Sequence, residues 1–491
     1  MTGSRDIADF VVVGSGAGGA TAALVLAEAG HDVIVLEEGP EVTPADRGLG
    51  PTEAFARLFR DRGAQVAMGR SVIPVLQGRC VGGTTVVNGA IVWRLPEDAH
   101  ARCFGAADAQ DTYPMRELER CFDRIERDLS VARVPDALLG GNGRLMRDGA
   151  AKLGWRGHAI RRNVLDCRGS ARCLEACPTQ QKQSMEVTYL PRAVKLGARI
   201  LSSREVRTIE MRGDRAVAAL GRDADGNTFR VEARRGVVLA ASAIQSPCIL
   251  QRSGLGGREH VGAHFTAHPA TAVMGVYPDD VRIWEGATQS YEVDHFRSEG
   301  FKLETASLPL ELAGVRVPGL GAEFARRMAD YPRMAVWGVQ VRAEAEGTVA
   351  SSGKETRITY TPTTRDMERF RRGVRELAKM HFAAGATRVL PGVHGGPALL
   401  ESIDDVGSLE DLSIDPRAYT LIASHLFGTC RMSNEAHDGV VDLNLAVHGV
   451  RGLWVVDASV FPTTLGVNPQ HTIMAVAMIA AERISESAPQ P

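Results

Sequence analysis

The amino-acid sequence predicts an α/β fold in which a Rossmann-type nucleotide-binding part is combined with a discontinuous α+β part. The first observation behind this prediction is the order of elements at the start of the chain. Two β-branched runs, residues 10–13 and 33–36, flank an alanine-rich stretch, residues 17–29, that favours a helix. Gly30 follows this stretch, where a residue able to adopt positive φ ends a helix. This order predicts a βαβ unit.

The second observation is that short apolar strands return late in the chain. Residues 237–239 and 453–456 are such runs, so we expect the chain to leave the nucleotide-binding part and to return to it. The expected division is 1–105, 191–276 and 401–491 for the nucleotide-binding part, 106–190 for an insertion on the substrate side that carries a cysteine cluster, and 277–400 for a substrate-binding part with an antiparallel sheet.

The middle of the chain has its own strand pattern. Residues 335–342 and 356–360 are predicted to be antiparallel strands joined by a Gly/Ser-rich turn around residues 351–353. Helices are predicted at residues 116–128, 365–384 and 472–485.

The composition is that of an ordinary globular protein with little net charge. Of 491 residues, 44% are hydrophobic and 24% are charged, and Lys+Arg 57 against Asp+Glu 59 gives a formal net charge of −2. This balance gives no reason to expect nucleic acid or a membrane as a partner, whereas a small neutral ligand fits. Residues 1–8 lack the pattern of a secretion signal, and no apolar stretch approaches the roughly 20 residues of a membrane span, so a cytoplasmic location is expected.

The first turn of the βαβ unit carries a dinucleotide-binding fingerprint, Gly14-Ser15-Gly16-Ala17-Gly18-Gly19. The first glycine permits a tight turn, the second lets a pyrophosphate approach the backbone, and the last lets the helix pack closely on the sheet. Glu37 ends the second β-branched run and is expected to accept hydrogen bonds from ribose hydroxyls. The expected nucleotide contacts are Gly14, Ser15, Gly16, Ala17, Gly19 and Glu37. The fingerprint does not distinguish FAD from NAD, because both carry the same ADP half.

Three further segments resemble the glucose-methanol-choline family of FAD-dependent oxidoreductases. The first, residues 78–89, reads GRCVGGTTVVNG and is similar to the family's first signature. The second, residues 240–256, is similar to the second signature. The third runs from His425 through residues 455–459 to His471 and resembles the catalytic end of the family.

The resemblance implies FAD as the cofactor and assigns further contacts to it. In the family, glycines of the first signature bring backbone amides against the flavin and the diphosphate, which a side chain would prevent. The helix that Pro469 begins is implied to point its N-terminus at the flavin O2 edge. Val87 stands where some relatives carry a histidine that links FAD covalently, so noncovalent FAD is expected. The implied contacts are Gly82, Gly83, Thr84, Asn88, Gly89, Val206, Asp457, Ala458 and Pro469.

The resemblance also maps two catalytic residues onto His425 and Asn468. An alcohol loses a hydride readily only when its hydroxyl proton leaves, and an imidazole that titrates near working pH is suited to take that proton. His425 is therefore expected to be the base, and Asn468 to donate a hydrogen bond to the developing alkoxide. His471 is a candidate that could support the site, face the substrate or cap a helix, and His268 is expected to be structural.

The implied activity is FAD-dependent oxidation of an alcohol to an aldehyde or ketone, by hydride transfer to flavin N5. Oxygen or another electron acceptor would then restore FAD. Two alternatives stay open: a flavin-dependent lyase or decarboxylase on the same scaffold, and a flavoprotein that only transfers electrons. The presence of both His425 and Asn468 argues against the last.

Three of the eight cysteines, Cys167, Cys173 and Cys177, lie close together in the sequence. Their spacing could hold an iron–sulfur cluster, as in some dehydrogenases of the family. A zinc site is disfavoured because no fourth ligand is evident nearby. Free thiols, a disulfide-prone pair or simple loop packing are the favoured alternative, so no metal is counted among the expected cofactors.

Overall fold

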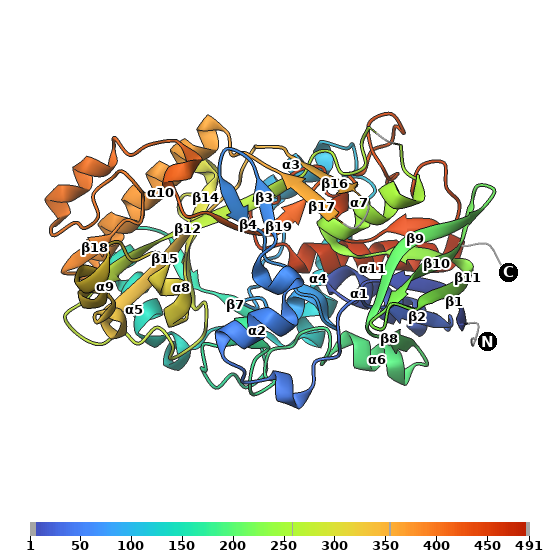
Figure 1. The fold of residues 1–491 in the computed structure, drawn as a ribbon, viewed down its shortest axis with the longest axis horizontal. Coiled ribbons are helices and arrows are strands. Elements are labelled where there is room, and N and C mark those ends of the chain that lie inside the picture. Colours follow the sequence, from blue (N-terminus) through green and yellow to red (C-terminus); the bar gives the residue numbers. More distant parts are fainter. Residues whose placement is uncertain (1–5, 258, 353–354, 488–491) are drawn as a thin grey trace.

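The computed structural model describes residues 6–257, 259–352 and 355–487, in which two seven-stranded sheets lie side by side (Figure 1). The first sheet starts with the predicted βαβ unit. β1 (Asp6–Val13) and β2 (Val33–Leu36) are parallel, and α1 (Ala17–Glu28) connects them. Gly30 has a φ of +84° just after α1, as predicted.

Late segments of the chain return to this first sheet. Its strand order is β8-β2-β1-β11-β10-β9, and β20 pairs with β11. β11 (Thr228–Leu239) and β20 (Leu453–Val455) are parallel neighbours, and α11 (Gln470–Ser487) packs against α1. The carboxyl ends of β1, β11 and β20 therefore meet at one edge, where ligands bind in such sheets. The other strands are β8 (Arg199–Leu201), β9 (Arg204–Arg212) and β10 (Arg215–Asp223).

The second sheet has the order β18-β12-β15-β14-β13-β6, and β19 pairs with β12. β12 (Thr266–Val276) and β19 (Ile422–Phe427) belong to it, although the expected division placed 191–276 and 401–491 in the nucleotide-binding part. Side-chain alternation predicts which faces of a strand are buried but not which sheet the strand joins. The other strands are β6 (Gly157–Ala159), β13 (Tyr291–Val293), β14 (Phe301–Thr305), β15 (Met334–Val341) and β18 (Arg388–Leu390).

The expected pairing of residues 335–342 with 356–360 is wrong. β15 pairs with β12 and β14, whereas β17 (Glu355–Thr359) forms a hairpin with β16 (Thr348–Ser352) and also pairs with β3 (Val66–Met68). Gly353 of the expected turn lies outside the described residues. The pairing failed because a strand pattern carries no information about distant partners.

The predicted helices form close to their expected bounds, as α4 (Met115–Asp128), α10 (Thr364–Ala383) and α11. α10 and α5 (Gly140–Lys152) pack on the second sheet. No helix within the described ranges has the length and apolar character that a membrane crossing needs. The remaining elements are α2 (Pro51–Leu58), α3 (Glu97–Gly105), α6 (Tyr189–Lys195), α7 (Ser242–Ser253), α8 (Leu310–Gly314), α9 (Gly321–Met328), β4 (Val72–Pro74), β5 (Val131–Arg133) and β7 (Arg161–Asn163).

Candidate active site

The dinucleotide fingerprint forms a glycine loop between β1 and α1. An added Cβ on Gly14, whose φ is +100°, would lie 2.3 Å from the carbonyl oxygen of Ala240, and one on Gly19 would lie 2.0 Å from that of Gly14. These two glycines let backbone segments approach more closely than a side chain permits. An added Cβ on Gly16 would meet no atom within 4 Å. The face of Gly16 is thus open, as a loop that receives a pyrophosphate requires.

Glu37 directly follows β2 and is only 7% exposed. Its carboxylate accepts hydrogen bonds from Ser15 N (3.0 Å), Ser15 Oγ (2.6 Å) and Gly39 N (2.8 Å). Burial raises the pKa of this carboxyl group, against the opposing effect of the three hydrogen bonds. The Glu37 carboxylate therefore fixes Ser15 of the glycine loop, in addition to the ribose contact that the sequence predicts.

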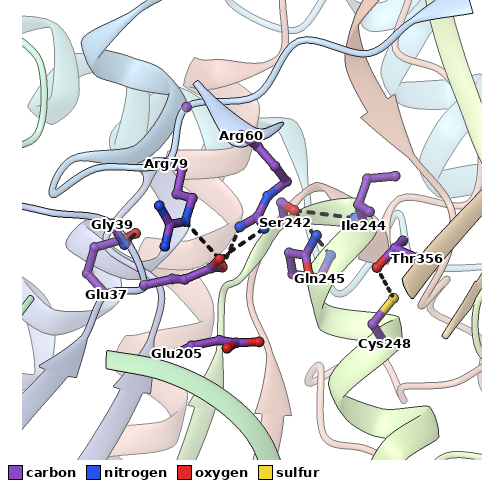
Figure 2. A network of polar contacts seen from close by, with 12 residues as sticks. Glu37, Gly39, Arg60, Arg79, Glu205, Ser242, Ile244, Gln245, Cys248 and Thr356 are labelled. Atoms are coloured by element: carbon purple, nitrogen blue, oxygen red, sulfur yellow. Dashed lines mark hydrogen bonds and ion pairs between the residues drawn. The ribbon is translucent and has the colours of Figure 1, made fainter. Parts of the chain in front are cut away.

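Glu38, the next residue, pairs with two arginines that the sequence analysis missed. Arg60 Nη2 lies 2.5 Å from Glu38 Oε2, and Arg79 Nε lies 2.9 Å from Glu38 Oε1. Figure 2 shows Arg60 and Arg79 pointing toward one carboxylate group. Since Arg79 belongs to the 78–89 segment, this ion-pair network ties the end of β2 to the second glycine-rich loop.

The second glycine-rich loop meets the first. Gly82 N donates a hydrogen bond to Ser15 Oγ at 2.9 Å. An added Cβ on Gly83 would lie 2.9 Å from Gly16 Cα. Both loops thus converge in front of the N-terminus of α1, although Ser15 and Gly82 are 67 residues apart in the chain.

Asn88 joins this second loop to the start of α11. Its Nδ2 donates to Gln470 Oε1 at 2.6 Å, while its Oδ1 accepts from Ala90 N at 3.0 Å. Thr84 Oγ1 accepts from Gly78 N at 3.0 Å and closes the loop upon itself. Gln470 was not singled out from the sequence, although its position next to the expected catalytic residues was a usable signal.

Asp457 follows β20 and connects it to α7. Its carboxylate accepts from Ser242 N (2.9 Å), Ser246 Oγ (2.5 Å) and Ser459 N (2.8 Å), and burial raises the pKa of Asp457. Ala458 begins the one-turn helix that follows. These contacts fix the third segment at the same sheet edge as the glycine loop.

Two other expected contacts lie on regular elements, and a third directly precedes one. Ala17 is the first residue of α1, and Val206 is buried on β9. Pro469 precedes α11, and its carbonyl oxygen accepts from Ile473 N at 2.9 Å, as the first turn of a helix requires. The N-terminal N–H groups of α11 therefore begin beside Asn468.

His425 lies on β19 directly opposite His268 on β12. Their Nδ1 atoms are 3.4 Å apart, and the two rings are perpendicular at 90°. Gly466 N donates to His268 Nε2 at 2.9 Å, so a neutral His268 carries its proton on Nδ1, the atom that faces His425. His268, expected to be merely structural, thus touches the candidate base.

Asn468 is held by a lysine that the sequence analysis did not select. Lys302 Nζ donates to Asn468 Oδ1 at 2.7 Å, and Lys302 is 1% exposed on β14. The usable signal was a lysine between Phe301 and Leu303 in a short apolar run. Lys302 also lowers the pKa of His425. One buried ammonium group therefore acts on both expected catalytic side chains.

His425 and His268 are neutral at neutral pH. Burial, with a smaller effect of Lys302, lowers the pKa of His425 to about 3. Burial also lowers the pKa of His268 well below its ordinary value. The near-neutral titration that the sequence suggests for His425 is thus replaced by a strongly lowered pKa, because the ring is taken out of water.

His471 is fully buried on α11 and lies against Phe122, with ring centroids 6.2 Å apart. Neither of its ring nitrogens has a hydrogen-bond partner among the described residues. Burial lowers its pKa to about 3. A side chain without a hydrogen bond does not cap the helix, so this one of its three expected roles is excluded.

Cys167, Cys173 and Cys177 line one pocket together with Lys182. Arg162 Nη2 donates to Cys173 Sγ at 2.8 Å and to the carbonyl oxygen of Gly89 at 3.0 Å, which connects this pocket to the back of the second loop. Within the part of the chain that the structure describes, no group of three His, Cys, Asp or Glu residues is arranged to hold a metal ion. The described cysteines are all free thiols.

Comparisons with known proteins bear on this arrangement. Two family models, both described as GMC oxidoreductase, match residues 9–270 and 343–477. An uncharacterized GMC-type oxidoreductase of Mycobacterium tuberculosis is 39% identical over 480 residues, which cover 97% of this chain and 75% of that protein. A long-chain-alcohol oxidase of Arabidopsis thaliana is 28% identical over 524 residues, covering 98% of this chain and 68% of that protein.

A solved structure shows the same fold. A formate oxidase variant from Aspergillus oryzae matches with a TM-score of 0.76 at 15% sequence identity, and the match covers 99% of each chain. With the family models on both halves and a relative at 39% identity, the chain belongs to the GMC oxidoreductase family.

Proposed function

We propose that this protein uses FAD to oxidise an alcohol to an aldehyde or ketone. Family membership implies FAD, and the alcohol is suggested by the Arabidopsis relative named a long-chain-alcohol oxidase. The observation that carries the proposal is that one buried ammonium group, Lys302, binds Asn468 and acts on neutral, buried His425, while Asn88 of the second glycine loop bonds to Gln470, two residues after Asn468. A proton acceptor and a hydrogen-bond donor are what removal of a hydroxyl proton needs.

The chain offers a cradle that fits FAD. The open face of Gly16 and the N-terminus of α1 suit the pyrophosphate, and Glu37 at the end of β2 suits the ribose. Gly82, Gly83 and Asp457 complete this cradle in the proposal, and Asn88 connects it to Gln470, two residues after Asn468. Val87 has no nucleophilic side chain, so the cofactor is noncovalent in this proposal. When bound, FAD supplies the hydride acceptor, N5.

His425 acts as the base in this proposal. Its neutral ring accepts the hydroxyl proton, and Asn468 Nδ2 donates a hydrogen bond to the oxygen as negative charge develops. The N-terminal N–H groups of α11 add positive potential beside Asn468. Oxygen or another electron acceptor completes the cycle.

The contact with His268 favours a second role for His425. If His268 Nδ1–H donates to His425 Nδ1, the single proton of neutral His425 lies on Nε2. The ring then donates a hydrogen bond to the alcohol oxygen and does not take its proton. Catalysis by His425 as a base therefore requires this hydrogen bond between the two rings to be broken or reversed.

The test is anaerobic bleaching of the flavin absorbance by a panel of primary, secondary and aryl alcohols. Bleaching by at least one alcohol, with the aldehyde or ketone as product, is the expected result. If no alcohol bleaches the flavin, alcohol oxidation is wrong. Products of C–C cleavage or of decarboxylation would then support the lyase or decarboxylase alternative, and reduction only by another electron donor would support the electron-transfer flavoprotein.

A further inference from the structure

We propose that Lys302 is a positioning residue that fixes the amide of Asn468, so that Nδ2 and not Oδ1 faces the alcohol. This inference rests on the proposed function, because it assigns a role to the donor in the proposed reaction. No motif marks Lys302, which is 166 residues from Asn468 in the chain.

The ammonium group of Lys302 makes three hydrogen bonds. Its Nζ donates to Glu292 Oε2 and Glu304 Oε2, both at 2.9 Å, and to Asn468 Oδ1 at 2.7 Å. An ammonium group has three hydrogens, so these three acceptors use all of them. The ammonium also lies 5.5 Å from the centre of the Trp93 ring. The orientation of Lys302 is therefore determined on every side.

The two carboxylates are themselves held in place. Glu292, 1% exposed, accepts from Trp93 Nε1 at 2.9 Å and lies 3.2 Å from His158 Nε2. Glu304 accepts from Gln289 Nε2 at 3.0 Å. A buried ion pair of this kind contributes little net stability compared with apolar residues, so a contribution to stability does not account for it.

The positioning role of Lys302 follows from the chemistry of an ammonium group, which donates hydrogen bonds and accepts none. An asparagine amide that flips exchanges its oxygen with its nitrogen. A flipped Asn468 would place its NH₂ group 2.7 Å from the ammonium of Lys302, where two sets of donors face each other. Lys302 therefore selects one of the two amide orientations and leaves Nδ2 free to donate elsewhere.

The charge of Lys302 has a second effect, on His425. It lowers the pKa of His425 and of His268, and Arg102 and Arg342 act on His268 in the same direction. Removing the ammonium should therefore raise the pKa of His425. This shift is independent of the amide orientation, so it can be measured separately.

The experiment is a double-mutant cycle on the FAD-loaded enzyme. Lys302→Gln, Asn468→Ala and the double variant are compared with the wild type by single-turnover flavin reduction with the best alcohol. Loss of an oriented donor lowers the rate by about 10² to 10³. We expect Lys302→Gln to lose at least about tenfold in the wild-type background and clearly less, about threefold or below, when Asn468 is already Ala, because only the effect of the Lys302 charge then remains.

Glu304→Gln is the matched control, because it changes a partner of Lys302 but keeps the ammonium and its bond to Asn468. Its rate should stay within about threefold of the wild type. Lys302→Arg, which keeps the charge and the donors, should restore part of the rate that Lys302→Gln loses. An equal loss from Lys302→Gln in both Asn468 backgrounds would overturn the positioning role.

A readout without alcohol separates this inference from the proposed function. Sulfite adds to flavin N5 and places negative charge on the ring, whatever the natural substrate is. Lys302→Gln should weaken sulfite affinity by about threefold to tenfold, whereas Glu304→Gln should not weaken it. If no alcohol is oxidised but sulfite affinity falls, the proposed function fails while the effect of Lys302 on the flavin site stands. Unchanged sulfite affinity and an unchanged rate in Lys302→Gln would end the proposal.

A second variant serves if Lys302→Gln does not fold. The Asn468→Asp side chain can accept a hydrogen bond from Lys302 but cannot donate one, so this variant should lose as much rate as Asn468→Ala. A wild-type rate of Asn468→Asp would contradict the proposal.

Discussion

His268 and His425 face each other across adjacent strands with their Nδ1 atoms 3.4 Å apart, and a backbone N–H at Gly466 sets the tautomer of His268. This contact connects the expected base to a residue that the sequence assigned only a structural role. The position of one proton on His425 therefore decides whether its ring accepts the hydroxyl proton or donates a hydrogen bond to the alcohol oxygen.

Replacing His425 distinguishes its two roles. As a base, it should contribute about 10² to 10⁴ in the rate of flavin reduction, and His425→Ala and His425→Gln should lose similar amounts. As a hydrogen-bond donor, it should be replaced in part by Gln, whose amide still donates, but not by Ala. Single-turnover reduction measured together with the flavin content decides between the roles.

The pH profile adds to this test. Burial and Lys302 lower the pKa of His425 to about 3, so its neutral form persists through neutral pH and is lost only as pH falls toward that value. We therefore expect a wild-type rate that is flat around neutrality and declines only in acid. A single ionisation near pH 7 that disappears in His425→Ala would contradict the lowered pKa of His425 but would still support its role as the base.

Glu37→Ala should reduce the FAD content of the purified protein. The carboxylate holds Ser15 and Gly39 as well as a ribose in the proposed complex, so its loss loosens both the loop and the cofactor. Glu37→Gln keeps the shape and part of the accepting capacity, and its FAD content should be intermediate. The ratio of flavin to protein absorbance after gel filtration measures the effect, and full occupancy of Glu37→Ala in dilute buffer would be the opposite result.

FAD should be released by acid. Val87 occupies the position where some relatives carry a linking histidine, and it is buried at 3% exposure. After trichloroacetic acid precipitation, the yellow colour should therefore appear in the supernatant. Flavin fluorescence that stays with the denatured polypeptide on a gel would show a covalent bond at another residue.

The nucleotide-binding half could be predicted because its signals are local. Residues 10–37 contain strand, glycine turn, helix, strand and acid in sequence, and each signal concerns neighbouring residues. The second sheet could not be predicted in the same way. β15 meets β12 and β14 through long-range register, and a strand pattern does not encode its partner.

The same contrast applies to the candidate site. His425 and Asn468 lie in motifs, so the sequence pointed to them. Lys302 and His268 reach them from other strands, and only the folded register brings them within hydrogen-bonding distance. Burial, which the sequence does not give for a single histidine, explains why the pKa of His425 is far below the expected neutral range.

His471 should make the protein less stable in acid. Burial lowers its pKa to about 3, while an unfolded chain restores the ordinary value near 6.5. Between these values the unfolded state binds a proton that the native state does not, so the free energy of unfolding falls as pH falls from about 6.5 toward 3. His471→Met removes the titrating ring.

We expect this variant to lose less stability than the wild type between pH 8 and pH 5, by about 1 to 2 kcal/mol. Thermal unfolding in excess FAD measures this difference, and His437→Met, at a side chain that is 81% exposed, is the control. An identical acid-side loss in His471→Met and His437→Met would show that His471 is protonated in the native state and is not held neutral by its burial.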